Sequence, residues 1–574
     1  MKRILTVALV CILVMALCSC QGSEAGITPV ETQDENVVSR PTLPPPVNDS
    51  PSNTARVATR LERDLNPLYP KHYATASLLR LVYEPLFDVG YDGVLTAVLA
   101  ESINWSLDGL TCTITIRKDK SFHDGRQVRA GDVRACLAKY LAIQSEIFTE
   151  HDLTASASAT QHKDQTILYD IKDLFYPENF SGITLYRRHC LDNIDSMSVD
   201  EQGALVIELL IPDPDFAGLL VFPVIPEDDV DTRSMNGPVG SGAWMIESSQ
   251  MDGGFVVSRV IPEGRVRRLE AVAFETILEA SRAYDRGELD ILLMDSTEAS
   301  LFADRSRIRK QRFDMPGFVS LFFSGRNEQA IENRNALLYV LQTGSSSDKL
   351  AAPLERAYYP LIAGDWRIPG SGISAPIVSE LSDRFLSDAQ ANDYDEVGEP
   401  EPGSADRKAF TLLVPEGFIP ARLVGNLRTR LLELNRQLIV VQIGREDWFA
   451  QLRNARYDAA LLTDSSDLFL DPLDYLDGLD TMGIYHWWEV IDDKDIGILR
   501  DARHLIGAMD ESVDVEALRQ VYADSLSRVF SIVPVIGLAT TATMVWYGDE
   551  VEGTMTGMWR SPYENVEELS IWRR

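Results

Sequence analysis

The chain has 574 residues, of which 45% are hydrophobic and 25% charged, and its formal net charge is −33 at pH 7. The length predicts roughly two to four folded units. The acidic balance argues against nucleic acid as a partner, because phosphate contacts need concentrated Lys and Arg. It also disfavours adhesion to anionic lipid by charge alone.

The first 20 residues, MKRILTVALVCILVMALCSC, are typical of a signal peptide. Lys2 and Arg3 precede an apolar run, Ile4 to Leu17, that is short for a membrane span. Leu17-Cys18-Ser19-Cys20 then has the form of a bacterial lipobox, which predicts lipidation of Cys20 and anchoring at a membrane surface. An ordinary secretory signal that contains cysteines is the alternative. No later run is long and apolar enough to span a bilayer.

The segment after the signal, residues 21–54, is rich in Ser, Thr, Pro, Glu and Asn and predicts a disordered tether. Short apolar strands then alternate with amphipathic helices. TCTITIRK (111–118) alternates with period two, whereas GDVRACLAKYLA (131–142) and ARLVGNLRTRLLELNRQ (421–437) have helical spacing. LIVVQIG, DWFAQLRNA and YDAALLT, within 438–463, predict strand, helix and strand. The pattern predicts an α/β fold with a parallel sheet covered by helices.

Three cysteines follow Cys20, and they form neither a CxxC pair nor a dense disulfide framework. Cys112 falls on the predicted strand and Cys136 on the predicted helix, so we expect both to be small buried apolar residues. A bridge between them is the alternative, which spacing alone does not decide. No such role is predicted for Cys190.

His123-Asp124-Gly125 lies between the predicted strand and the predicted helix. Asp-Gly is a strong turn signal, so we expect a structural corner there, followed by Asp132 in the first helical turn. A metal ligand or proton-transfer pair is the alternative, but the other histidines show no HExxH or paired spacing. No metal and no cofactor are predicted.

A second motif, GPVGSGAW (237–244), is rich in glycine but lacks the Lys-Ser/Thr of a phosphate-binding loop and the GxGxxG spacing. We expect a tight turn that leads into a strand. The sequence also has no GxSxG nucleophile elbow, so a secreted hydrolase is disfavoured and no enzyme is predicted.

An apolar strand ends in LLTDSSDLFLDPLDYL (461–476), which carries Asp464, Asp467 and Asp471. Ligands of open α/β sheets gather beyond the carboxyl ends of strands, where a carboxylate can pair with a cation. Asp467 is read either as such a carboxylate or as a helix cap, and Asp471 as a cap. Downstream, IYHWWEV (484–490) places Trp487 and Trp488 together, as cleft wall or as core.

In order along the chain, these segments resemble the extracytoplasmic solute-binding proteins of the oligopeptide, dipeptide and nickel type, which serve ABC importers. The family pattern LYEPL corresponds to Leu81–Leu86 (LVYEPL), and L-R-x-G-V-x-F-H-D-G corresponds to the segment that ends at Gly125. Further matches are the glycine-rich turn, AYDRGELDIL (283–292), RNALLYVLQT (334–343), RYDAALLTDSSDLFLDPLDYL (456–476) and FSIVPVIGLATTATMVW (530–546). In this family the F-H-D-G corner is structural.

The resemblance implies a two-lobed, type II periplasmic-binding-protein-like fold whose lobes are joined by hinge strands. Lobe I is expected over 55–270, completed by 536–574, and lobe II over 271–535. A peptide, or a similar small amine-bearing solute, would bind between the lobes and pass to the ABC permease subunits. The implied protein is a monomer held outside the cytoplasm, on the periplasmic or outer cell surface. A ligand-sensing or interaction lipoprotein with the same fold is the alternative.

The resemblance also implies ligand-binding residues. Peptide-binding members carry an Asp that pairs with the α-amino group of the peptide, and Asp467 matches its position, although Asp464 replaces the family Trp. Tyr83 and Glu84, on the LYEPL segment, are expected first-lobe contacts, with ordinary strand packing as the alternative. Trp487 and Trp488 are expected second-lobe walls.

One departure from the family affects a helix start. Arg129 stands where the family pattern has Thr, so one N-cap oxygen is lost, which costs about 1 kcal/mol.

Overall fold

The computed structural model describes the chain from Ser50 onward, with gaps. The described residues are 50–69, 71–89, 95–153, 193–210, 212, 216–295, 298–299, 302, 308–324, 330–343, 355–356, 408–415, 421–444, 447–454, 456–465, 497, 534–558 and 560–573.

Helices and strands alternate along most of this part of the chain. The helices are α2 (Tyr73–Leu79), α3 (Ala130–Leu153), α6 (Ile277–Asp285), α8 (Ala330–Thr343), α10 (Ala421–Glu433) and α11 (Trp448–Asn454). The first strands are β1 (Thr54–Arg60), β2 (Phe87–Val89), β3 (Leu95–Ala97), β4 (Ala100–Trp105), β5 (Thr111–Ile116), β6 (Ile194–Val199), β7 (Leu205–Leu209), β8 (Trp244–Ser249), β9 (Phe255–Arg259), β10 (Arg268–Phe274) and β11 (Ile291–Asp295). The later strands are β12 (Arg309–Phe323), β13 (Glu355–Arg356), β14 (Lys408–Pro415), β15 (Arg436–Ile443), β16 (Ala459–Ser465), β17 (Val535–Tyr547), β18 (Val551–Glu552) and β19 (Ser570–Ile571).

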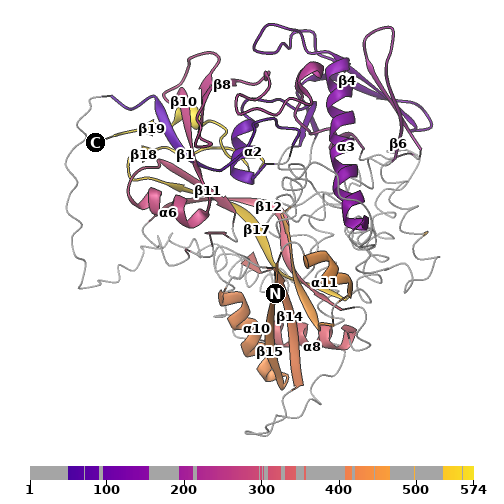
Figure 1. Cartoon of the computed structure of the whole chain (residues 1–574), viewed down its shortest axis with the longest axis vertical. Coiled ribbons are helices and arrows are strands. Elements are labelled where there is room, and N and C mark those ends of the chain that lie inside the picture. Colours follow the sequence, from indigo (N-terminus) through magenta and orange to yellow (C-terminus); the bar gives the residue numbers. More distant parts are fainter. Residues whose placement is uncertain are drawn as a thin grey trace, which may run out of the picture. The chain divides into compact units, whose positions relative to one another are not determined.

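One large sheet has the strand order β15-β14-β16-β12-β17-β11-β1-β10-β9-β8, and β13 pairs with β17. It contains two groups of parallel strands: β1 is parallel to β10 and β11, and β14 is parallel to β15 and β16. β12 and β17 pair antiparallel with each other (Figure 1). On its other side, β17 pairs antiparallel with β11 of the first group, and β12 pairs antiparallel with β16 of the second group. Two long strands therefore join two α/β units through one continuous sheet.

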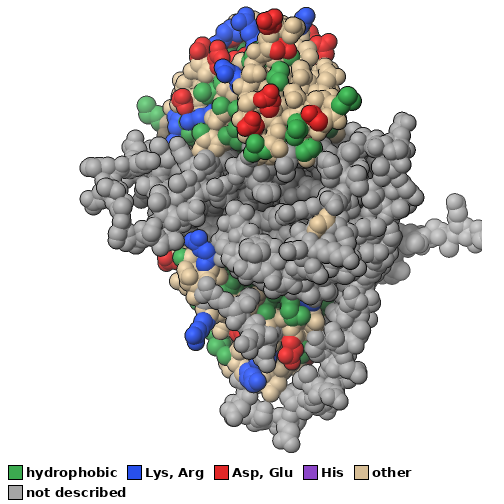
Figure 2. Space-filling view, turned by 90° about the vertical axis from the view of Figure 1, so that its right-hand side faces the viewer, with side chains coloured by type: hydrophobic (Ala, Val, Ile, Leu, Met, Phe, Trp, Pro, Cys, Tyr) green, Lys and Arg blue, Asp and Glu red, His purple; other side chains and the backbone are tan. Residues whose placement is uncertain are grey.

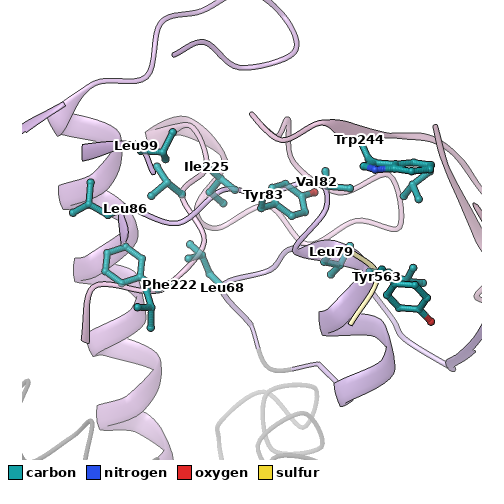
Figure 3. Packing of buried hydrophobic residues seen from close by; sticks show 14 of the residues in the cluster. Leu68, Leu79, Val82, Tyr83, Leu86, Leu99, Phe222, Ile225, Trp244 and Tyr563 are labelled. Carbon is teal, nitrogen blue, oxygen red and sulfur yellow. The ribbon is translucent and has the colours of Figure 1, made fainter. Parts of the chain in front are cut away.

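The first α/β unit surrounds β1. Residues Ile291 to Met294 of β11 are all buried, as expected for a strand covered on both faces. Helix α6 connects β10 to β11; its N-cap Thr276 accepts a hydrogen bond from the Glu279 amide, and Gly287 follows its C-cap at a φ of 73°. A large apolar core packs against this unit and brings together Leu68, Leu79, Val82, Tyr83, Leu86, Leu99, Phe222, Ile225, Trp244 and Tyr563 (Figure 3).

A four-stranded antiparallel sheet, β4-β5-β7-β6, belongs to the same core. The predicted strand is confirmed as β5, and every second residue of it, including Cys112, is buried. Helix α3 carries Cys136, and both cysteines are buried free thiols, so the alternative of a bridge between them is wrong. Burial raises the pKa of each thiol to about 12, which leaves both unreactive at neutral pH.

The second α/β unit confirms the predicted order of strand, helix and strand. After β14 come α10, β15, α11 and β16, and β14 pairs in parallel with both β15 and β16. Helix α10 ends just before Asn435, whose φ of 52° lets the chain reverse into β15. The parallel pairing follows from the crossover helices, because parallel neighbours need such a connection.

The two ends of the described chain meet beside β1. Ser52 forms a bridge with Ile571, and the Arg573 guanidinium donates to the Thr54 carbonyl oxygen at 2.9 Å. Arg573 also pairs with the fully buried Asp290, which binds Arg56 at 2.7 Å. The first and last described segments of the chain therefore lie next to each other in the first unit.

Acidic and basic side chains are interspersed over the described surface, as Figure 2 shows for one face. In the described part of the chain, helices long and apolar enough to cross a membrane are not found.

Candidate functional site

The segment that carries Tyr83 and Glu84 continues directly from α2. The amides of Val82 and Tyr83 both donate to the Leu79 carbonyl oxygen, so this segment remains attached to the helix. Tyr83 is 1% exposed, and its hydroxyl donates to the Pro238 carbonyl oxygen at 2.9 Å. Burial raises the pKa of the phenol, which therefore stays neutral. Tyr83 is placed as a core residue that holds a neighbouring loop.

Glu84 lies beside it with a half-buried carboxylate. Its Oε1 accepts a hydrogen bond from Lys120 Nζ at 2.6 Å, and its backbone oxygen accepts one from the Val224 amide. Its Oε2 is shielded from solvent and has no hydrogen-bond partner among the described residues. A buried carboxylate oxygen without a donor is costly, so this oxygen is the natural acceptor for an incoming N–H group.

The glycine-rich loop lies along this segment and explains the spacing of its glycines. The Gly242 amide donates to Val82 O and the Trp244 amide to Leu81 O, at 2.9 and 3.1 Å. A Cβ on Gly240 or Gly242 would overlap the Val82 or Leu81 carbonyl oxygens, so no larger residue fits without movement of the backbone. The predicted turn that leads into a strand is confirmed, because β8 begins at Trp244.

His123 holds the other side of the same loop. Its backbone amide donates to Gly240 O at 2.8 Å, and its Nε2 lies 2.9 Å from Gly242 O. Because a carbonyl oxygen only accepts, the proton of the ring is on Nε2. Asp124 accepts from the Arg126 amide at 3.0 Å, and Gly125 has a φ of 88°. The predicted structural corner is confirmed, and the ring contacts the backbone of the glycine-rich loop.

The start of α3 is also built as predicted. Asp132 Oδ2 accepts from the Arg129 amide at 2.9 Å, and its Oδ1 accepts from the Glu227 amide at 3.0 Å. The carboxylate therefore satisfies one donor of its own helix start and one donor of a neighbouring turn.

The remaining predicted site residues are not brought together by the described structure. The backbone of Asp464 lies in β16, paired with Phe318 of β12. Cys20, Asp467, Trp487 and Trp488 lie outside the described residues. Their predicted roles therefore stay predictions.

The sequence reasoning missed Lys120 as the partner of Glu84. A signal was present, since Lys120 stands at the valine of the family pattern that ends in F-H-D-G. A lysine that replaces an apolar residue beside a core segment requires a counter-charge, and Glu84 supplies it. Within the described ranges, three or more metal-ligating side chains are not found together.

The arrangement defines a class of protein. Two α/β units that share one sheet through two long strands form the two-lobed fold of type II periplasmic binding proteins. The chain matches the family described as bacterial extracellular solute-binding proteins, family 5, middle, over residues 94–481, and it belongs to that family. Members are extracytoplasmic binding proteins of ABC importers and are not enzymes.

Solved structures agree on the fold. NikA from Brucella suis, in complex with Fe(III)-EDTA, has a TM-score of 0.62 at 17% identity, over 90% of this chain and 99% of that chain. DppA from Helicobacter pylori, in complex with the peptide STSA, has a TM-score of 0.56 at 14% identity, over 91% of this chain and 98% of that chain. AppA from Bacillus subtilis, in complex with a nonapeptide, has a TM-score of 0.55 at 15% identity, over 91% and 99%. No curated protein shows a significant match to the chain.

Proposed function

We propose that the chain is the lipid-anchored substrate-binding protein of an ABC transporter. It captures a peptide, or a similar small amine-bearing solute, between two lobes and delivers it to a membrane permease. The family membership carries this proposal. The complexes of DppA and AppA with peptides support a peptide as the ligand, whereas the complex of NikA with Fe(III)-EDTA makes a metal chelate the main alternative.

The mechanism needs no chemistry on the solute. A ligand that touches both lobes binds the closed form more tightly than the open form and so shifts the population toward closure. On the first lobe, Glu84 Oε2 offers an acceptor that already lies in a shielded position. On the second lobe, Asp467 pairs with the ammonium group of the ligand, Asp464 lies nearby in sequence, and Trp487 and Trp488 form flat walls.

The lobes divide where the joining strands leave each unit. β11 pairs with β1, although it falls within the range that the sequence assigned to lobe II. We therefore assign β11 and residues 309–313 to lobe I, and the stretch that begins at Gly317 to lobe II. Cys20 carries the lipid, and the tether expected over residues 21–54 lets the lobes reach a permease. Its last residues already pair in the folded unit, Ser52 with Ile571 and Thr54 with Arg268.

Native mass spectrometry of the purified protein tests the ligand class, since a captured solute adds its own mass to the folded chain. A peptide mass supports the proposal, and a metal chelate or another solute replaces the peptide assignment.

Titration with the identified peptide and with its N-acetylated form then tests the contact. Asp467→Ala should weaken binding of the free amine at least about tenfold, because it removes a charge-assisted pair, and should leave the acetylated form unchanged. Glu84→Gln should also weaken binding, but less than Asp467→Ala does. It exchanges the acceptor Oε2 for an amide NH2 group and leaves the pair between Asp467 and the ammonium group in place. Equal affinities of wild type and Asp467→Ala for the free amine would remove Asp467 from the site.

A further inference from the structure

The hairpin between β4 and β5 ends in an exposed leucine. Leu107 lies in the turn, and its side chain is fully exposed. The turn is fixed from within. The Gly109 amide donates to Ser106 O at 3.0 Å, and the Leu110 amide donates to Asp108 Oδ1 at 3.1 Å. A leucine on such a preformed turn loses little conformational freedom when a partner covers it.

More apolar residues surround this turn at the same end of the four-stranded sheet. The Leu209 amide donates to Leu110 O at 2.8 Å, so the end of β7 lies beside the hairpin. Leu210 follows directly and is 60% exposed. Pro212 lies against the turn, since a Cβ on Gly109 would be 3.2 Å from Pro212 Cβ. Two segments that are far apart in the sequence thus bring apolar side chains to one place.

An aromatic ring extends this group along β4. Trp105 ends the strand and is 37% exposed, and its ring meets that of the buried Phe216 edge-on, with the centroids 6.3 Å apart. Tryptophan is among the residues that contribute most to binding at protein interfaces. These residues form one surface, called here the tip patch: Trp105, Leu107, Leu110, Leu210 and Pro212. Exposed apolar side chains scattered singly are ordinary, whereas a contiguous group of them marks an interaction site.

The charges around the tip patch all have one sign. The sheet segments 100–116 and 193–210 contain no Lys or Arg. They carry the carboxylates of Glu101, Asp108, Asp195, Asp200, Glu201 and Glu208. None of these is found in an ion pair within the described ranges, whereas Glu247 of β8, for comparison, pairs with an arginine of β10 at 2.9 Å. Arg117, the first cation after β5, follows the end of the strand away from the tip patch and pairs with Asp119 at 2.7 Å.

This one-sided charge discriminates between the partners that an apolar patch can take. A second copy of the chain would bring the same carboxylates into contact, and like charges across an interface are costly. An anionic lipid surface is disfavoured for the same reason. A partner with Lys and Arg around an apolar centre is complementary, because its cations meet the carboxylates while its centre covers the leucines.

We propose that the tip patch is a docking surface for a basic protein, one whose contact surface carries Lys and Arg around apolar side chains. The inference goes beyond the proposed function, because the four-stranded sheet is separate from the large sheet that joins the two α/β units. In this arrangement the leucines and Trp105 supply the contact area, and the carboxylates speed association and select the partner.

A synthetic peptide of alternating leucine and lysine, labelled with a fluorophore, is the probe for the apolar part. Its anisotropy is titrated with the full chain at low ionic strength, where charge attraction is least screened. The double variant Leu107→Ser, Leu210→Ser should weaken binding at least about tenfold, because it removes the two most exposed anchors. Leu278→Ser, at an exposed leucine of α6, is the matched control and should bind like wild type. Equal affinities of the double variant and the wild type would overturn the proposal.

The charged part is tested with the same probe. Glu208→Lys reverses a carboxylate one residue from the end of β7, and Glu263→Lys makes the same change in net charge on the exposed turn after β9. Glu208→Lys should weaken binding several times more than Glu263→Lys does, because charge complementarity acts at the contact. Equal losses would mean that the peptide senses only the net charge of the chain, and the tip patch would then not be its docking surface.

Two further measurements test the other occupants. Flotation with phosphatidylglycerol vesicles reports lipid binding by the tip patch, and sedimentation of the chain over a range of concentrations reports self-association. Vesicle binding or a dimer that the double leucine variant abolishes would overturn the basic partner in favour of lipid or of a second copy. Absence of both, together with the loss of peptide binding in the variants, would support it.

Discussion

His123 and Gly242 hold the glycine-rich loop in place from two sides. The imidazole and the backbone amide of His123 hold two carbonyl oxygens of the glycine-rich loop, while Gly242 lies against the Leu81 and Val82 backbone. The sequence predicted a corner and a turn at these places, because Asp-Gly and glycine-rich dipeptides are local signals. It did not predict that the two pack on each other, because that contact joins residues about 120 positions apart.

Gly242→Ala should destabilise the fold by about 3 kcal/mol, because the new Cβ would collide with backbone atoms that cannot move alone. Chemical denaturation followed by circular dichroism measures the change. Gly218→Ala is the matched control, since a Cβ there meets nothing within 4 Å, and it should unfold like wild type. Equal losses in both variants would show that the loop is not tightly packed.

Glu62 predicts a pH dependence. Burial raises the pKa of this carboxyl to about 7, although the nearby Lys71 and the hydrogen bond from the His72 amide oppose the shift. The other groups that face it are Asp64, which also raises the pKa, and the Thr75 hydroxyl. His72 itself stays neutral, because burial and Arg60 lower its pKa to about 3.

The sign follows from proton binding. The folded state holds the Glu62 proton more tightly than the unfolded state, so this contribution to stability is fully present below about pH 4.5 and is lost as the pH rises through about 7. We expect the free energy of unfolding to fall by about 2 kcal/mol on this account between pH 5 and pH 8.

Urea denaturation of wild type and Glu62→Gln at pH 5, 6, 7 and 8 checks the expectation. The amide keeps the acceptor for the His72 amide but does not titrate, so the difference between the two proteins should change steadily with pH. A constant difference would show that Glu62 does not titrate in this range.

At the scale of elements, the spacing of apolar residues predicted several of the strands and helices that the structure contains. The alternation in β5, the apolar faces of α3 and α10 and the strand-helix-strand order of 438–463 all follow from local spacing. The ion pair between Lys120 and Glu84 was not predicted, because it joins two loops and so produces no periodic pattern in the sequence. The long α3, which continues to Leu153, was predicted only to Ala142, because its second half lacks a clear apolar face.

The start of α3 offers a stabilising substitution. Asp132 reaches back to the Arg129 amide, but Arg129 has no side-chain oxygen to return the bond to the first turn. Arg129→Thr should therefore raise the free energy of unfolding by about 1 kcal/mol. The thermal midpoint of this variant, compared with that of Arg129→Ala, measures the cap. Equal midpoints would show that the hydroxyl does not reach the helix amides.

At the scale of the whole molecule, the joining strands are the feature that the sequence predicted only through a family resemblance. Arg309 pairs with Tyr547 across more than 200 positions of intervening chain. Hydrophobic runs in 309–323 and 535–547 are compatible with many partners, and register between distant strands has no local signal. The irregular register between Asp314 and Phe318 is likewise known only from the observed pairing.

The meeting of the two chain ends beside β1 has a practical consequence. Because Ser52 bridges Ile571 and Arg573 reaches Thr54, a short linker could connect Arg573 to Ser50 without moving either strand. A circularly permuted protein, opened instead at the fully exposed hairpin tip at Met251, should fold and melt close to the parent temperature. Scanning calorimetry compares the two, and a large loss would mean that joining the ends or opening the hairpin disturbs the strands beside them.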